Sequence, residues 1–351
     1  MLASLAVVCL HSASDRGTAA VFAGRLPRGF PVPQIPADNP ISEEKVQLGR
    51  WLFYDTRLSG NQTYSCSSCH RQARAFTDGR AQALGSTGEA HQRSALSLTN
   101  VAYNASYGWA DEQRRTLEAQ MEVPMYNEHP IELGVKDRDA EIVSRFTSRS
   151  DDVERFRAAF PEEPPAVTMP HVVKAIASFE RVLLSGNSPF DRYLYQDDRS
   201  GLSPQELRGS ALFFSNRLRC SECHSSFNLS GPVRYEGAPM APLVFHNNGL
   251  FSLDLGLFAQ TRRKDDMGRF RAPTLRNIAV TAPYMHDGSV PTLRAAVEHY
   301  TRGGHAGPSR SDRIRGFQIS EAEIDDLIAF LESLTDKDFL TNPALSDPHI
   351  K

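Results

Sequence analysis

The sequence predicts a mainly α-helical protein built as two domains that pack against each other. Helical patterns recur along the 351 residues, and no segment alternates apolar and polar residues for long enough to predict a sheet. Two copies of one Cys-x-x-Cys-His pattern lie far apart, each among helical segments, which predicts one domain around each copy.

Four segments carry the clearest helical signals. The first opens at Ser42 and spaces apolar side chains three or four residues apart up to Phe53. The second has Pro170 in its first turn and continues its apolar spacing to Leu183. The third and fourth begin with capping boxes, each a serine followed three residues later by a glutamate: Ser203 with Glu206, and Ser320 with Glu323.

The chain divides into four parts on this interpretation. Residues 1–27 form an export signal and a flexible N-terminus, because a short apolar stretch precedes a segment rich in Ala, Pro and Gly. A frayed terminus without an export role is the alternative. Residues 28–185 form the N-terminal domain, residues 186–340 the C-terminal domain, and residues 341–351 a loose polar tail.

Composition excludes several classes of protein. The chain is 40% hydrophobic and 23% charged, as is ordinary for a soluble globular protein. Its formal net charge of -3 predicts no nucleic-acid partner, and no apolar run approaches the ~18 residues that span a bilayer. Cys9 is a possible lipid anchor, but Ala6, Val7 and Val8 make a poor lipidation motif, so we expect it to be removed with the signal.

The repeated pattern points to a cofactor. Its copies are Cys66-Ser-Ser-Cys69-His70 and Cys220-Ser-Glu-Cys223-His224. Cys-x-x-Cys-His is the attachment motif of c-type haem. On a helical turn both thiols reach the haem vinyl groups while the histidine meets the iron. A zinc site would leave both histidines unused, and disulfides within Cys-x-x-Cys would be strained. The sequence therefore predicts two covalent haems, two cytochrome c-like haem domains, and a periplasmic location.

Four longer motifs extend the analysis: Leu48-Gly-Arg-Trp-Leu-Phe-Tyr-Asp-Thr-Arg-Leu-Ser-Gly60, Ala75-Phe-Thr-Asp-Gly79, Phe270-Arg-Ala-Pro-Thr-Leu-Arg-Asn277 and Thr281-Ala-Pro-Tyr-Met-His-Asp-Gly-Ser289. With these motifs the chain resembles the bacterial di-haem cytochrome c peroxidase and MauG superfamily over about residues 28–335. Other motifs are most similar to the MbnH-like di-haem enzymes found beside methanobactin operons: Gly85-Ser-Thr-Gly-Glu-Ala-His91, Asn100-Val-Ala-Tyr103, Trp109-Ala110 and Pro124-Met-Tyr-Asn-Glu-His-Pro-Ile-Glu-Leu-Gly134.

The resemblance implies that Tyr300 is the second axial ligand of haem 2, opposite His224. The peroxidases of the family have a methionine at this place, whereas MauG and MbnH have a tyrosine. A thioether favours Fe(II), and a hard, anionic phenolate should favour Fe(III) and Fe(IV). In the alternative interpretation Tyr300 only packs at a helix end, and Met285 or His299 is the ligand.

The resemblance implies an open coordination position on the iron held by His70. The peroxidases bring a distal histidine to this iron, and the equivalent position here is Ser86, with His91 nearby. The family's distal-pocket residues match Gln120, Pro124 and Glu132. Glu132 is the expected acid-base group of the peroxide reaction and would need a raised pKa, with a solvated loop carboxylate as the alternative.

Two further roles follow from the resemblance alone. Trp109 falls where the family places a tryptophan that relays electron holes between the haems, although core packing is the usual role of a tryptophan. The family also holds a calcium ion between the domains. Its ligands map onto the backbone of Thr281 and Pro283 and onto Ser94, where the family has an asparagine.

The leading functional interpretation is an oxidase that uses hydrogen peroxide to reach a bis-Fe(IV) state and then oxidises a partner protein. The resemblance implies a tryptophan of an MbnP-like copper-binding protein, converted to kynurenine. The alternative is a cytochrome c peroxidase that draws electrons from a small redox protein. A pure electron carrier would need two strong ligands on each iron.

Overall fold

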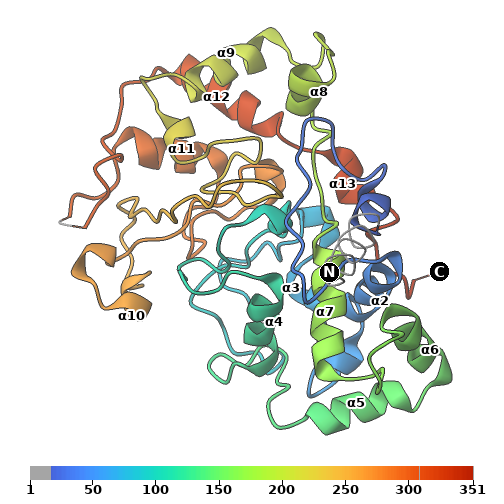
Figure 1. The fold of residues 1–351 in the computed structure, drawn as a ribbon. Coiled ribbons are helices and arrows are strands. Elements are labelled where there is room, and N and C mark those ends of the chain that lie inside the picture. Colours follow the sequence, from blue (N-terminus) through green and yellow to red (C-terminus); the bar gives the residue numbers. More distant parts are fainter. Residues whose placement is uncertain (1–16, 308, 351) are drawn as a thin grey trace, which may run out of the picture.

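The computed structural model describes residues 17–307 and 309–350. Helices form the framework, and within these residues backbone pairing is limited to isolated bridges (Figure 1). The α-helices are α2 (Glu43–Phe53), α3 (Cys66–Cys69), α4 (Leu117–Tyr126), α5 (Asp139–Thr147), α6 (Ser150–Ala159), α7 (Met169–Glu180), α8 (Pro189–Tyr195), α9 (Pro204–Phe213), α10 (Phe258–Thr261), α11 (Leu293–Thr301), α12 (Glu321–Glu332) and α13 (Lys337–Thr341). The predicted mainly α-helical fold is confirmed.

The predicted helix starts are present in the structure. The Ser42 hydroxyl accepts a hydrogen bond from the Lys45 backbone N–H at the start of α2. Pro170 lies in the first turn of α7, where its missing N–H costs nothing. Reciprocal capping boxes begin α9 and α12, because in each the serine hydroxyl and the glutamate carboxylate satisfy each other's backbone N–H groups: Ser203 with Glu206, and Ser320 with Glu323.

Two hydrophobic cores divide the molecule, each built on a pair of closely packed helices. In the first core α2 crosses α7 at Gly49, where an added Cβ would lie 1.9 Å from the Ala175 carbonyl oxygen. In the second core α9 crosses α12 at Gly209, where an added Cβ would lie 1.9 Å from the Asp326 carbonyl oxygen. Both contacts require glycine.

The two ends of the described chain pack more tightly than the sequence led us to expect. Val21 and Phe22 are buried in the first core, although residues 17–27 were expected to be flexible. Phe339 in α13 packs against Phe76 with tilted rings whose centroids are 5.5 Å apart, and Leu345 is also buried in the first core. The tail is therefore not loose: α13 and the residues after it return to the N-terminal domain (Figure 1). The expected export signal up to residue 16, with Cys9, lies outside the described residues.

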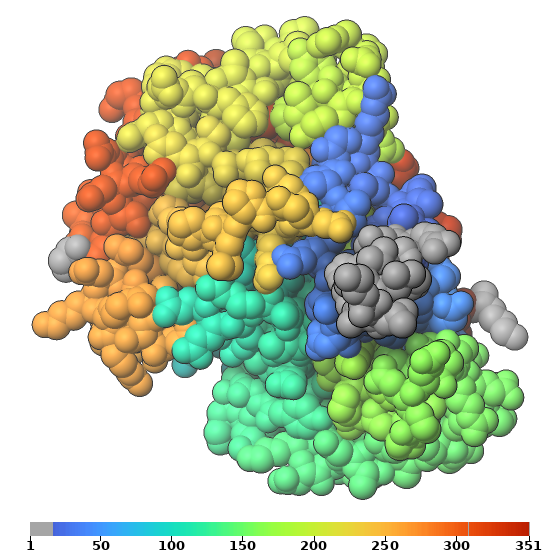
Figure 2. All heavy atoms as spheres, viewed as in Figure 1, coloured from blue at the N-terminus to red at the C-terminus, as the bar shows by residue number. Residues whose placement is uncertain are grey.

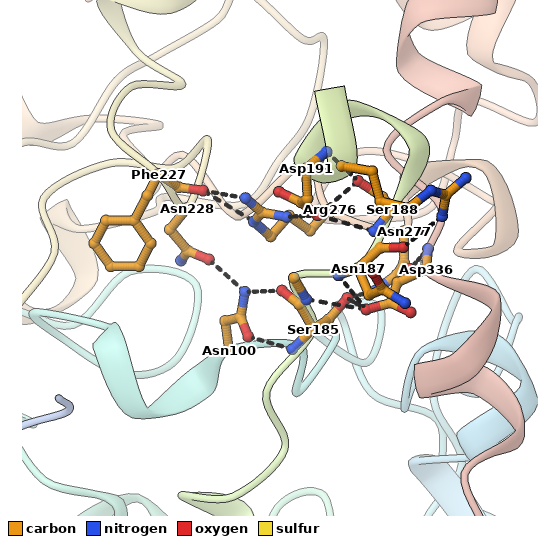
Figure 3. Close-up of polar contacts among 12 residues, drawn as sticks. Asn100, Ser185, Asn187, Ser188, Asp191, Phe227, Asn228, Arg276, Asn277 and Asp336 are labelled. Carbon is orange, nitrogen blue, oxygen red and sulfur yellow. Dashed lines mark hydrogen bonds and ion pairs between the residues drawn. The ribbon is translucent and has the colours of Figure 1, made fainter. Parts of the chain in front are cut away.

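A buried polar network joins the two domains near the expected boundary (Figure 3). Asn100 donates from its amide to the Ser185 carbonyl and to Asn228 Oδ1, and it accepts from the Ser185 backbone N–H. Asn277 donates to Ser185 Oγ and accepts from the Asp336 backbone N–H. Because these side chains are almost fully buried and their hydrogen bonds are made, the network fixes how the domains meet.

Candidate active site

Each Cys-x-x-Cys-His motif forms part of the wall of a cavity. The first cavity is lined by Cys66, Cys69 and His70, and the second by Cys220, Cys223 and His224. All four thiols are free, and the described residues contain no cluster of three His, Cys, Asp or Glu side chains that would hold a metal ion. The zinc and disulfide alternatives are therefore not supported, and the thiols are available for thioether bonds to haem.

Both motif histidines are positioned to offer Nε2 to an iron. His70 Nδ1 donates to the Phe76 carbonyl oxygen at 2.8 Å, and His224 Nδ1 donates to the Pro273 carbonyl oxygen at 3.1 Å. Burial lowers the pKa of both rings, that of His224 to about 4, so they are neutral. A neutral ring whose Nδ1–H is bound to a carbonyl keeps the Nε2 lone pair for the metal. The residues present thus fit a haem in each cavity.

The three predicted distal residues meet in the first cavity. Gln120 and Pro124 come from α4, and Glu132 comes from the loop that follows it. The Leu133 backbone N–H donates to the Pro124 carbonyl oxygen at 2.8 Å, which fixes the Glu132 loop against the end of α4. Burial raises the pKa of Glu132 to about 7, against a lowering effect of Arg114. Glu132 lines the cavity and is partly buried, and a carboxyl with this pKa would exchange a proton near neutral pH, so its acid-base role stays a prediction.

The sequence interpretation left His91 out of this cavity. Its Nε2 lies 3.9 Å from Glu132 Oε1. The loop that carries His91 lies against the Glu132 segment, because the Ser86 backbone N–H donates to the Glu132 carbonyl and an added Cβ on Gly85 would lie 1.7 Å from the Ile131 carbonyl oxygen. Ser86 thus makes a backbone contact, and the Gly85–His91 motif was the signal for the histidine.

The second cavity contains both an expected ligand and its rival. Tyr300, near the end of α11, and Met285 both line this cavity. His299 is not among the lining residues, and its Nε2 donates to the Asn248 carbonyl oxygen. The Asn248 amide lies between the two candidates, 3.3 Å from Tyr300 Oη and 3.3 Å from Met285 Sδ. Sequence reasoning missed Asn248, since no motif surrounds it.

Trp109 lies in the wall of both cavities. Its indole Nε1 donates to the Ser94 carbonyl oxygen at 2.9 Å, and its own carbonyl accepts from the Arg271 backbone N–H. Its ring centroid lies 6.4 Å from that of His286. The indole is therefore held in one orientation between the two motif-bearing cavities.

The calcium expectation stays a prediction. The hydroxyl of Ser94 donates to the Met285 carbonyl oxygen at 3.2 Å, and that of Thr281 donates to the Ile278 carbonyl oxygen at 3.1 Å. A hydroxyl that donates its proton keeps its oxygen lone pairs, so Ser94 could still join the carbonyl oxygens predicted at Thr281 and Pro283 around a calcium ion.

Comparison with known proteins identifies the two-cavity arrangement. The family model described as di-haem cytochrome c peroxidase matches residues 43–199, and one described as RoxA-like, cytochrome c-like matches residues 269–303. The methylamine utilization protein MauG of Methylorubrum extorquens is 34% identical, over 94% of this chain and 88% of the relative. The chain belongs to the di-haem cytochrome c peroxidase family. It therefore carries two covalent c-type haems and is a haem peroxidase-type oxidoreductase.

Other members of the di-haem cytochrome c peroxidase family are comparably similar. The cytochrome c551 peroxidase of Pseudomonas aeruginosa is 33% identical, over 85% of this chain and 80% of the relative. A crystal structure of a MauG-like protein associated with microbial copper homeostasis matches with a TM-score of 0.89 at 43% identity, covering 92% of this chain and 98% of that one. Names of both MauG and peroxidase kind thus accompany the same fold.

Proposed function

We propose that this protein uses hydrogen peroxide to oxidise a residue of a partner protein, namely a tryptophan that becomes kynurenine on an MbnP-like copper-binding protein. The observation that carries the proposal is the place of Trp109 in the wall of both cavities. A substrate held in one folded protein cannot enter the haem cavity of another, so electrons must leave it over a distance. The copper-homeostasis association of the similar MauG-like structure supports the choice of partner.

When bound, the haems supply the reduction of peroxide and the storage of two oxidising equivalents. The chain's own residues direct that chemistry. Glu132 takes a proton from one peroxide oxygen and returns it to the other as the O–O bond breaks, since its pKa of about 7 suits both roles. Gln120 and Pro124 shape the space where peroxide binds. Trp109 passes electrons between the two sites.

Tyr300 distinguishes this proposal from peroxide detoxification. Tyr300 would hold the second iron as a phenolate, which would favour high oxidation states and so suit storage of oxidising equivalents rather than entry of single electrons. Burial raises the pKa of the Tyr300 phenol, while the Asn248 amide lowers it. The function also needs export, because the thioether bonds form outside the cytoplasm, and we therefore place the protein in the periplasm. No helix of the described residues is long and apolar enough to cross a membrane.

A conventional cytochrome c peroxidase is the second candidate, and Met285 is the observation that favours it. Its thioether sulfur faces the second cavity beside Tyr300 and accepts from the same Asn248 amide. Methionine ligation would suit electron entry from a small redox protein. A ferric spectrum of the untreated protein with a tyrosinate signature on the low-spin haem would favour the oxidase over this candidate.

The proposal is tested by mass spectrometry of an MbnP-like protein after reaction with the holoenzyme and peroxide, with the near-infrared spectrum of the enzyme recorded in parallel. After peroxide is added, oxidising equivalents shared between the two haems are expected to give a near-infrared absorption band. Trp109→Phe should abolish this band and slow partner oxidation at least about tenfold. Trp51→Phe is the matched control, because Trp51 packs on Arg155 and His349 at the surface of the first domain. An unmodified partner, with rapid turnover of reduced cytochrome c, would contradict the proposal.

A further inference from the structure

The segment of residues 248–255 exposes apolar side chains to solvent and turns polar side chains toward the protein, the opposite of the usual arrangement. Phe251, Leu253 and Leu255 are 81%, 94% and 42% exposed, whereas the polar side chains between them face the protein. The chain bends at Leu253, and the three apolar side chains at and beside this bend form an apolar face turned to solvent. An apolar face of this kind on a soluble protein marks an interaction surface.

The polar side of the segment attaches it to the walls of the two cavities. Ser252 Oγ lies 3.3 Å from the Nε2 atom of His286, which lines the second cavity beside Trp109. Asp254 forms an ion pair with Arg93 of the first cavity, with Oδ2 2.6 Å from Nε. Ser252 and Asp254, which alternate in sequence with the exposed residues, therefore connect the exposed face directly to side chains that line the two cavities.

The segment around the exposed face carries almost no charge, which indicates what kind of partner binds it. Residues 237–253 contain no Asp, Glu, Lys or Arg, and their one titratable side chain, His246, lies in the wall of the second cavity. Met240 and Val244 in the same segment are also exposed. A neutral, apolar surface binds a neutral, apolar surface of another protein, and it lacks the basic residues that attract anionic lipid.

We propose that Phe251, Leu253 and Leu255 form the docking surface for the protein substrate, which covers them with an apolar patch around the residue to be oxidised. This inference rests on the proposed function. The redox route selects the substrate over a second copy of the chain, because the contacts from Trp109 through His286 to Ser252 end under this face. In Figure 2 the gold part of the chain around residue 250 lies exposed near the centre of the drawn face.

The test compares the Phe251→Ser/Leu253→Ser holoenzyme with an Ile350→Ser control, since Ile350 is 76% exposed in the tail of the chain. Peroxide turnover with a small dye reductant should stay within twofold of wild type in both, which shows that folding and haem attachment are intact. Oxidation of the MbnP-like protein at low concentration should fall at least about tenfold in the double variant only. Equal oxidation by wild type and double variant would overturn the inference.

Two further outcomes separate this inference from the proposed function. If wild type leaves the MbnP-like protein unmodified, the proposed function fails, and reduced cytochrome c replaces that protein as the probe. An unchanged cytochrome c turnover in the double variant would then overturn the docking surface, and a tenfold loss would retain it for a redox protein. If the double variant loses self-association or binding to phosphatidylcholine vesicles while its oxidation of the partner is unchanged, the face binds a second copy of the chain or a membrane instead. Either result would overturn the inference.

Discussion

Asn248 holds its side-chain nitrogen 3.3 Å from the phenol oxygen of Tyr300. The orientation of this amide is determined by its other end, because Asn248 Oδ1 accepts from the Leu250 backbone N–H at 3.2 Å. The nitrogen must then face the second cavity, where it also lies 3.3 Å from Met285 Sδ. A donor at this point stabilises an ionised phenol far more than it stabilises a thioether. Asn248 therefore favours Tyr300 as the ligand of the second iron.

Replacing Asn248 with leucine should weaken the bond that we propose between Tyr300 and the second iron. The amide lowers the pKa of Tyr300, so its loss raises that pKa, and on acidification the phenolate should leave the iron at a pH higher by about one to two units. Ferric absorption and electron paramagnetic resonance spectra recorded against pH measure the transition. Asn248→Gln retains a donor and should lie between wild type and leucine. An unchanged transition in the leucine variant would rule out this role.

Glu132→Gln should slow the reaction with peroxide by roughly 10²–10⁴, the usual contribution of an acid-base group. Burial places the pKa of Glu132 at about 7, so the carboxylate that accepts the peroxide proton forms as pH rises through that value. The stopped-flow rate in wild type should therefore rise between about pH 6 and pH 8, and it should lose this dependence in the variant. Glu128→Gln is the control, because that carboxylate is exposed and paired with Lys136. A wild-type rate in Glu132→Gln would exclude the proton-transfer role.

Local patterns made most of this architecture predictable. The capping boxes and the Cys-x-x-Cys-His motifs depend on contacts between residues three or four positions apart, so a short stretch of sequence is enough to predict them. The family resemblance predicted that residues without a shared local motif lie in one site, and Gln120, Pro124 and Glu132 do line one cavity.

Features that depend on distant segments were not predictable in the same way. Asn248 reaches Tyr300 across 52 positions of sequence, and no periodicity records such a contact. Leu345 accepts a hydrogen bond at its carbonyl from Tyr54 Oη, so a tail that reads as polar and rich in proline is nevertheless held on the first domain. The second motif also differs from the expected α-helical turn, because Cys220–Glu222 is a 3-10 turn.

Glu180→Gln should stabilise the protein at alkaline pH. Glu180 ends α7, lines the first cavity and is buried, and burial raises its pKa to about 8. When a carboxyl has a higher pKa in the folded than in the unfolded chain, the free energy of unfolding falls as pH rises between the two pKa values. The variant should therefore nearly equal wild type at pH 4.5 and exceed it by about 4–5 kcal/mol at pH 9. Denaturant unfolding of the holoprotein at both pH values measures this, with exposed Glu162→Gln as control. Equal stability of the Gln variant and wild type at pH 9 would show that Glu180 is not the source.

Arg276→Met should destabilise the C-terminal domain beside its junction with the N-terminal domain by about 3–5 kcal/mol, because it leaves a buried aspartate without its cation. Arg276 Nη1 lies 2.8 Å from Asp191 Oδ2, both side chains are almost fully buried, and the guanidinium also donates to the Phe227 carbonyl oxygen (Figure 3). Arg294→Met is the control, since its ion pairs with Glu321 and Asp325 are exposed and should contribute less than about 1 kcal/mol. If the cost comes from the orphaned charge, adding Asp191→Asn to Arg276→Met should recover part of the lost stability in denaturant unfolding. A double variant less stable than Arg276→Met alone would instead show that the Asp191 carboxylate matters chiefly as the acceptor for the backbone N–H and hydroxyl of Ser188.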